Sequence, residues 1–222
     1  IYMAIRRPNK PPEVASDVFA ISTRLQRTTA GSSYPRAVSN FPVDAVIRRN
    51  DINSTGNPYL ASRLTGAAIN TDQNNAEWIQ GHLFFASNIG LSTGSGAAET
   101  DDYYWMFKRA PGFMDVVTYS GNLTARTISH NLLVIPELVI VKNRTDTGGA
   151  MWAVWSSYMQ ERYRMALNDT HQELNGGTSY WNANSTFTAT HFGVGDGAAT
   201  NQNNHNFVAY LFATLPGISK VG

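Results

Sequence analysis

One short segment occurs three times along the 222 residues of this chain. It reads YMAIRRPN at residues 2–9, WMFKRAPG at 105–112 and YLFATLPG at 210–217. Each copy begins with an aromatic residue, continues with mostly apolar residues, and ends in a proline followed by Gly or Asn. The three prolines are 103 and 105 residues apart, which is the size of a small domain.

Other landmarks repeat at nearly the same distance, with offsets that range from 94 to 103 residues. Such a drift is expected when loops of different length join the strands of one scaffold. The matching pairs are 41–48 with 135–142, 68–70 with 166–168, Trp78 with Trp181, and 88–90 with 191–193.

We interpret each Pro-Gly pair as the turn that leads from one module into the next. The repeat therefore divides the chain into four parts. They are residues 1–11, the closing strand of a preceding module; 12–111, the first complete module; 112–216, the second; and 217–222, the start of a following module.

The segments between these landmarks are typical of short β-strands, because they are rich in Val, Ile, Phe, Tyr and Trp and are bounded by Gly, Asn, Asp and Pro. The charged fraction of 15% is low against about 25% in soluble domains. We predict an all-β chain of tandem β-sandwich modules, jelly-roll or concanavalin-like, of about 100 residues each. Residues 158–167 are the single candidate for a helical turn. The expected strands are 18–22, 45–49, 82–86, 103–108, 138–142, 151–155, 185–189 and 207–213.

The composition gives no support to several classes of function. The absence of cysteine excludes disulfides, cysteine-ligated zinc and a thiol nucleophile. A formal net charge of +1 provides no field that would attract nucleic acid. No apolar run approaches the roughly 18 residues of a membrane span, so membrane insertion is not expected.

The motifs that could carry chemistry are weak. The five histidines never fall at a metal-binding spacing. Residues 90–94 formally fit the G-x-S-x-G nucleophile elbow, but the aligned position in the second module is Gly195, so we expect a glycine-rich hairpin loop. Turns at 70–75, 101–102 and Asp196 could supply oxygen ligands to calcium, although solvated turns are the simpler interpretation. We therefore expect no catalytic residue, no cofactor and no metal site.

Aromatic side chains are concentrated in the second module. Aromatic residues are common platforms in binding interfaces, and core packing is the alternative for each of them. Alternation along residues 151–155 places Trp152 and Trp155 on opposite faces of a strand, and we expect one face to be core. The six candidate ligand-binding residues are Trp152, Trp155, Tyr158, Tyr163, Tyr180 and Trp181.

Five segments of the second module, 118–122, 128–132, 135–144, 152–155 and 207–217, carry a resemblance. From about residue 112 to 222 the chain resembles tandem-repeat β-sandwich structural proteins of marine bacteriophages, of a tail-fibre or appendage type with concanavalin-like or laminin-G-like modules. The first module matches them more loosely. The resemblance implies a location in the virion, on the surface of the extracellular particle, and binding to a host-surface glycan. The resemblance implies no catalytic residues.

We therefore expect a non-catalytic virion structural protein, part of a phage tail fibre or appendage, whose modules stack end to end with modest interfaces. Its partners would be other copies of itself or other virion proteins, and its exposed loops would bind the host surface. Two alternatives stay open. A capsid decoration or other architectural protein would have large apolar lateral interfaces. A polysaccharide depolymerase would need two acidic residues facing each other across a cleft at roughly 5 to 9.5 Å.

Overall fold

The computed structural model describes residues 10–23, 37–49, 56–79, 85–92, 102–146 and 148–222. These residues form fifteen β-strands and one α-helix of four residues, α1 (Ala198–Asn201). The pairs of neighbouring strands are antiparallel. The prediction of an all-β fold is confirmed. The finer prediction of tandem sandwich modules stays a prediction.

Two local predictions are wrong. Residues 158–167, the candidate helical turn, contain strand β12 (Tyr163–Ala166) between two turns. Residues 185–189, expected as a strand, begin in the 3-10 helix η2 (Asn184–Thr186) and continue as a loop. The Thr186 hydroxyl donates to the Ala183 carbonyl at 2.6 Å, a local bond that competes with strand pairing. Most of the expected strand 82–86 lies outside the described residues.

The first half of the chain forms a five-stranded sheet, one face of which is covered by a two-stranded sheet. Apolar side chains from both sheets, including Val46, Tyr104 and Met106, form what we call the first-half core. The 3-10 helix η1 (Ala15–Asp17) precedes the large sheet. In spatial order the large sheet consists of β1 (Phe19–Ser22), β7 (Tyr103–Phe107), β3 (Ala45–Arg49), β4 (Tyr59–Ser62) and β5 (Ala68–Asn70). The small sheet consists of β2 (Ala37–Val38) and β6 (Gly90–Leu91).

The second half forms a six-stranded sheet that is covered in the same way. Its second-half core contains Val139, Trp155, Phe192 and Leu211 among others. In spatial order the large sheet consists of β8 (Met114–Ser120), β15 (Asn206–Phe212), β10 (Leu138–Asn143), β11 (Ala153–Ser156), β12 and β13 (Leu174–Asn175). The small sheet consists of β9 (Arg126–Ser129) and β14 (His191–Val194).

The two large sheets have the same strand order. The order β1-β7-β3-β4-β5 corresponds to β8-β15-β10-β11-β12, and β13 extends the second sheet by one strand. Equivalent positions also make equivalent backbone hydrogen bonds. The Asp44 N–H donates to the Phe107 carbonyl at 2.8 Å, and the Glu137 N–H donates to the Phe212 carbonyl at 2.9 Å.

The Pro-Gly turns repeat in structure as well as in sequence. In each turn, the residue after the glycine donates its N–H to the carbonyl of the residue that lies two positions before the glycine. These bonds join Phe113 to Ala110 at 3.1 Å and Ile218 to Leu215 at 2.9 Å. The two glycines have φ angles of 75° and 79°, a left-handed conformation that glycine adopts without steric cost.

In strand β3 the sequence alignment is displaced by one residue. It matches Val46 with Ile140, yet Val46 packs in the first-half core and Ile140 packs on the opposite face of its own sheet. Strand pairing relates Val46 to Val139 instead, because Val46 pairs with Met106 and Val139 pairs with Leu211, two residues that the repeat does match. A displacement of one residue reverses the face of every side chain.

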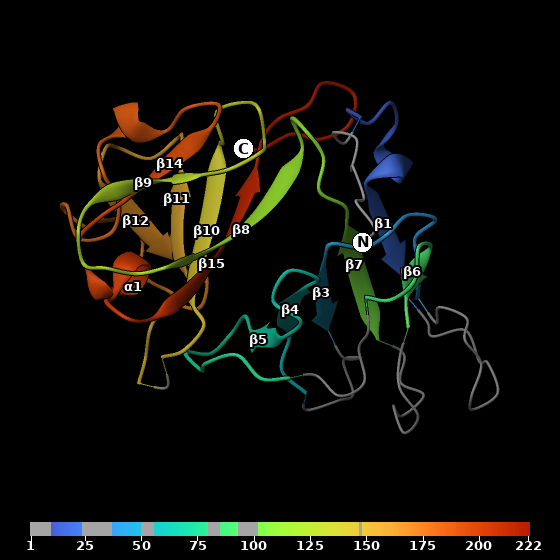
Figure 1. Cartoon of the computed structure of the whole chain (residues 1–222), viewed down its shortest axis with the longest axis horizontal. Helices are drawn as coiled ribbons and strands as arrows, with labels where there is room; N and C mark the ends of the chain where they lie inside the picture. Colours follow the sequence, from blue (N-terminus) through green and yellow to red (C-terminus); the bar gives the residue numbers. More distant parts are fainter. Residues whose placement is uncertain (1–9, 24–36, 50–55, 80–84, 93–101, 147) are drawn as a thin grey trace, which may run out of the picture.

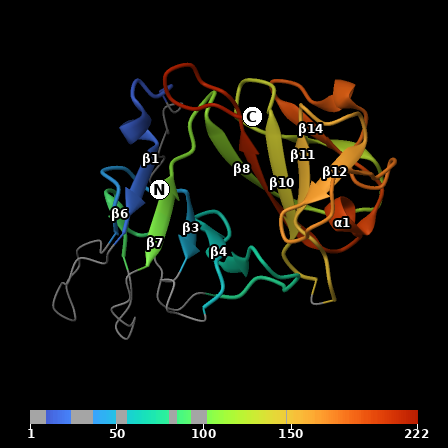
Figure 2. The same cartoon turned by 180° about the vertical axis from the view of Figure 1, so that it is seen from behind.

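The two large sheets pack against each other through the faces that their small sheets leave uncovered (Figures 1 and 2). Each large sheet therefore contributes buried residues from both of its faces. This arrangement differs from the modest end-to-end contact expected from the sequence, because the second face of each sheet is also apolar. The resulting shared core contains Val18, Ala45, Leu60, Ile69 and Ala110 from the first half, and Phe113, Met114, Val116, Trp152, Val208 and Tyr210 from the second.

Polar contacts also link the two halves. The Arg144 guanidinium donates two hydrogen bonds to the Glu77 carboxylate, at 2.8 and 2.9 Å, in the bidentate geometry that favours arginine. The Arg109 side chain donates to the buried Asp115 carboxylate at 2.6 Å, and its main-chain N–H donates to Asp44 at 2.8 Å. These contacts fix the orientation of the two sheets around the shared core.

We expect His130 to make the stability of the protein sensitive to pH. The residue is 5% exposed; its Nδ1 accepts the Leu132 N–H at 3.2 Å, and its Nε2 lies 3.2 Å from the Thr188 carbonyl. Burial lowers the pKa of His130 from the ordinary 6.5. The unfolded chain then binds the proton more readily than the folded chain. The free energy of unfolding is therefore highest above pH 6.5, and it decreases as pH falls from there through the lowered pKa. Thermal melts between pH 8 and pH 5 are expected to show a decrease in Tm that is smaller in His130→Asn. Equal pH slopes in the two proteins would refute this.

Candidate functional site

The structure places three of the six predicted ligand-binding residues inside the protein. Trp152, Trp155 and Trp181 are 0%, 3% and 0% exposed. Trp152 belongs to the shared core, whereas the other two belong to the second-half core. There Trp155 stacks on Phe187 with ring centroids 3.8 Å apart. The three tryptophans pack the core and have no surface to offer to a ligand.

The three tyrosines are more accessible. Tyr158 is 70% exposed, and its hydroxyl donates to the Val221 carbonyl at 3.3 Å. Tyr163 and Tyr180 are half-buried against the second-half core. Of the six residues, only Tyr180 lines one of the pockets described below.

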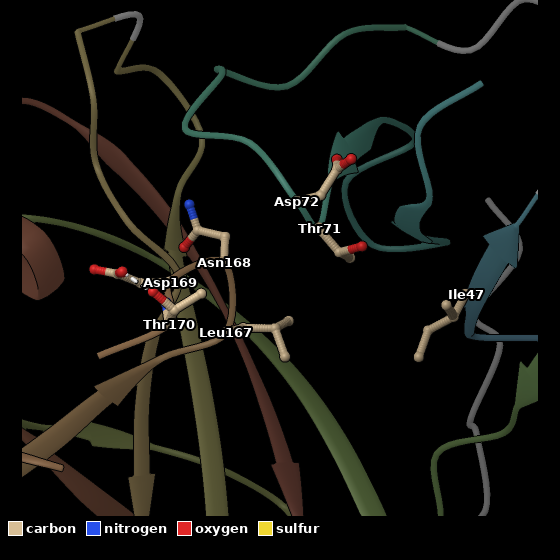
Figure 3. A pocket seen from close by; sticks show the side chains of 7 residues that line it. All are labelled: Ile47, Thr71, Asp72, Leu167, Asn168, Asp169 and Thr170. Carbon is tan, nitrogen blue, oxygen red and sulfur yellow. Dashed lines mark hydrogen bonds between the residues drawn. The ribbon is translucent and has the colours of Figure 1, made fainter. Parts of the chain in front are cut away.

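A pocket of about 580 Å³ lies between the two halves, and we call it the seam pocket (Figure 3). Its walls come from strand β3 and from the loops that follow β5 and β12. The Ile47 and Leu167 side chains point into the hollow from opposite sides, and the Asp72 and Asp169 carboxylates point away from each other. The pocket is lined by Ile47, Thr71, Asp72, Leu167, Asn168, Asp169 and Thr170.

Trp152 holds the two loops of the seam pocket in place. Its main-chain N–H donates to the Asn168 side-chain oxygen at 3.0 Å, and its indole N–H donates to the Asn70 carbonyl at 2.7 Å. The Asn168 amide in turn donates to the Asn74 side-chain oxygen at 2.5 Å. The sequence alignment matched Asn70 with Asn168, whereas the strand register relates Asn70 to Ala166. Trp152 is thus a positioning residue for the pocket.

A second pocket, of about 470 Å³, lies on the outside of the second half, and we call it the Tyr180 pocket. One wall is the loop between β10 and β11. The other wall is formed by residues 179–180 and by α1 with the glycine that precedes it. The pocket is lined by Asp146, Gly148, Gly149, Ala150, Met151, Ser179, Tyr180, Gly197, Ala198 and Ala199.

The glycines of residues 193–197, at the end of β14 and in the loop that follows it, are required by close packing. A Cβ atom on Gly193 would lie 1.9 Å from the Thr186 hydroxyl, and one on Gly195 would lie 2.0 Å from the Thr178 carbonyl. A Cβ atom on Gly197 would lie 2.5 Å from the Ser179 carbonyl. The glycine-rich hairpin loop was expected at residues 90–94. Gly90 and Leu91 form strand β6, and residues 93–94 lie outside the described residues.

Comparison with known proteins gives one match. A family model described as a domain of unknown function, DUF7483, matches residues 94–222, more than half of the chain. This chain belongs to the DUF7483 family. No curated protein and no solved structure matches it. The Tyr180 pocket lies entirely within the DUF7483 match, whereas Ile47, Thr71 and Asp72 of the seam pocket lie outside it.

Within the DUF7483 match, a buried lysine supports one wall of the Tyr180 pocket. Lys142 is fully buried, and its ammonium donates to the Ala150 carbonyl. Burial lowers the pKa of Lys142 to about 8, and the nearby Asp146 opposes that shift. The Asn143 side-chain oxygen accepts the Asp146 N–H at 3.1 Å, so two neighbouring residues of β10 hold the loop.

The DUF7483 match also contains a serine and a histidine within hydrogen-bonding distance. The Ser129 hydroxyl lies 3.1 Å from His191 Nε2, and the Thr190 hydroxyl lies 2.8 Å from His191 Nδ1. In a catalytic Ser-His pair, a carboxylate normally orients the histidine. Here the Thr190 hydroxyl lies where that carboxylate would be. Ser129 and His191 are also direct cross-strand partners of β9 and β14, which is a sufficient structural reason for their contact.

In the oxygen-rich turn at residues 70–75, the polar side chains bind one another. The Asn70 and Asn75 side chains both donate to the Gln73 side-chain oxygen, at 3.1 and 2.5 Å. Among the described residues, no three His, Cys, Asp or Glu side chains come together in a way that could hold a metal ion. In the same ranges, no helix is long and apolar enough to cross a membrane.

Proposed function

We propose that this DUF7483 protein is a non-catalytic structural part of a phage tail fibre or appendage, exposed on the virion, whose loops bind a host-surface glycan. In this proposal the chain contains two tandem β-sandwich modules, each made of one large and one small sheet. The matching strand order of the two large sheets and the matching Pro-Gly turns support the tandem arrangement. The resemblance of residues 112–222 to phage structural proteins supports the location.

The observation that carries the proposal is the rigid support of the pocket loops. Trp152 ties two loops of the seam pocket to the shared core, and Tyr180 and Ser179 accept backbone N–H bonds from Gly195 and Gly197, at 3.0 and 2.9 Å. Loops that are already ordered lose less conformational entropy when a ligand binds. A rigid scaffold with pre-ordered surface pockets suits a display module.

Immunogold electron microscopy tests the proposed location. Antibodies raised against the purified chain are expected to label a fibre or appendage of intact particles from the source. A pre-immune serum gives the background, and antibodies to the major shell protein give the position of the capsid. Failure to label purified particles, with label on cell material only, would overturn the proposal.

A second candidate function, an architectural role in the capsid, is favoured by one exposed apolar loop. Leu133 and Ile135 are 58% and 57% exposed, and Val134 between them is also exposed. Leu133 has a φ of 63°, an uncommon conformation for a residue with a side chain. Consecutive exposed apolar side chains are typical of protein contacts. In the same experiment, label over the capsid shell would favour this candidate over the fibre.

A further inference from the structure

We propose that the Tyr180 pocket is the glycan site and that it binds a single neutral pyranose ring. This inference rests on the proposed binding function and adds to it a site and a ligand class. The volume of about 470 Å³ lies within the range of roughly 300 to 1,000 Å³ that is typical of small-molecule sites.

A weakly bonded hydroxyl in this pocket points to a ligand rich in oxygen, because Tyr180 and Met151 both line it. The Tyr180 hydroxyl and Arg164 Nη1 both donate to the Met151 sulfur, at 3.8 and 3.2 Å. A thioether is a weak acceptor, so both donors would gain from an oxygen atom. A sugar hydroxyl or ring oxygen in the pocket would give the Tyr180 hydroxyl the stronger acceptor that it lacks.

The opposite wall provides the complementary acceptor. Asp146 Oδ1 accepts the Gly148 N–H at 2.7 Å, which leaves most of the lone pairs of this carboxylate for other donors. Adjacent hydroxyl groups of a pyranose can donate to one carboxylate. Donors on one side and an acceptor on the other match a ligand that has both kinds of group, as sugars do.

The charges near the pocket favour a neutral ligand. The Arg164 guanidinium lies 4.5 Å from the centroid of the Tyr180 ring and covers one of its faces, so a sugar would meet the other face or the hydroxyl edge. The Asp146 carboxylate lies in the wall itself. Asp146 is the charged residue among those that line the pocket, and its carboxylate would repel an acidic sugar.

Small residues keep the pocket open. Gly148, Gly149 and Gly197 line it together with Ala150, Ala198 and Ala199. Gly149 has a φ of 124°, which residues with a side chain rarely adopt. Ala198 is exposed, so a large side chain there would fill the pocket without entering the core.

Saturation-transfer NMR on the whole chain tests the inference with defined probes. The probes are the methyl glycosides of glucose, mannose, galactose and N-acetylglucosamine, with glucuronate as the acidic comparison. At least one neutral glycoside is expected to bind with a Kd of about 1 mM, which is about 4 kcal/mol of binding free energy. Asp146→Asn and Ala198→Trp are each expected to weaken this binding at least about tenfold, a loss of about 1.4 kcal/mol.

Asp72→Asn is the matched control, because it makes the same change to a carboxylate of the seam pocket and is expected to leave the Kd unchanged. Thermal melts that coincide with the wild type show that each variant is folded. Three outcomes would overturn the inference: no neutral glycoside binds, glucuronate alone binds, or Asp72→Asn abolishes binding while the other two variants do not. Particle labelling without sugar binding would refute the sugar site and leave the proposed location standing. Sugar binding without particle labelling would support the sugar site and refute the proposed location.

Discussion

Replacing Trp152 by alanine is expected to lower the free energy of unfolding by about 3 to 5 kcal/mol. The side chain is fully buried in the shared core and packs near Tyr210, with ring centroids 6.4 Å apart. Its removal leaves a cavity between the two large sheets and also leaves the Asn70 carbonyl without the indole donor. Both losses fall on the interface that joins the halves.

Urea denaturation followed by circular dichroism measures this effect. Trp152→Phe is the graded variant, since it keeps a ring but loses the 2.7 Å bond to Asn70, and it is expected to cost less than alanine. The wild type is expected to unfold in one transition because both halves share a core. A loss below about 1 kcal/mol in Trp152→Ala, against the range expected for a buried aromatic residue, would show that the halves do not depend on this contact.

Replacing Gly195 by alanine is expected to destabilise the chain by about 3 kcal/mol, the upper part of the range for overpacking. The new Cβ atom would lie 2.0 Å from the Thr178 carbonyl and 2.7 Å from the Ser179 carbonyl carbon. Both obstacles are backbone atoms, which cannot rotate away as a side chain can. The hydrogen bonds between residues 178–180 and 195–197 would have to lengthen.

Gly177→Asn is the control for this prediction. Gly177 has a φ of 58°, which asparagine tolerates better than most residues, and a Cβ atom there would meet no other atom within 4 Å. Its melting temperature is expected to stay close to that of the wild type, while that of Gly195→Ala falls. Similar melting temperatures for Gly195→Ala and the wild type would mean that the two loops are not in close contact in solution.

The sequence predicted the all-β class and several strands because these depend on local composition and on the repeat. Strand register was harder, as Val46 illustrates: apolar residues on both faces of β3 and β10 make two alignments equally good in sequence. The burial of both Trp152 and Trp155 was hard to predict for a similar reason. Alternation places them on opposite faces of one sheet, but only the packing of a second sheet decides that neither face is exposed.

The candidate sites could be predicted only in part. Tyr180 was selected as an aromatic residue, and it does line a pocket. Asp146, Met151 and Arg164 gave no signal, because they are brought to Tyr180 by the pairing of β11 with β12 and by loops that are distant in sequence. The seam pocket depends entirely on contacts between the halves, which no local pattern records.

The packing of the two large sheets has a consequence for symmetry. Each sheet uses the face opposite its small sheet, so the surface that joins the halves is of the same kind on both sides, as in a two-fold symmetric dimer. Separation of the two halves would leave one apolar face of each of them in water.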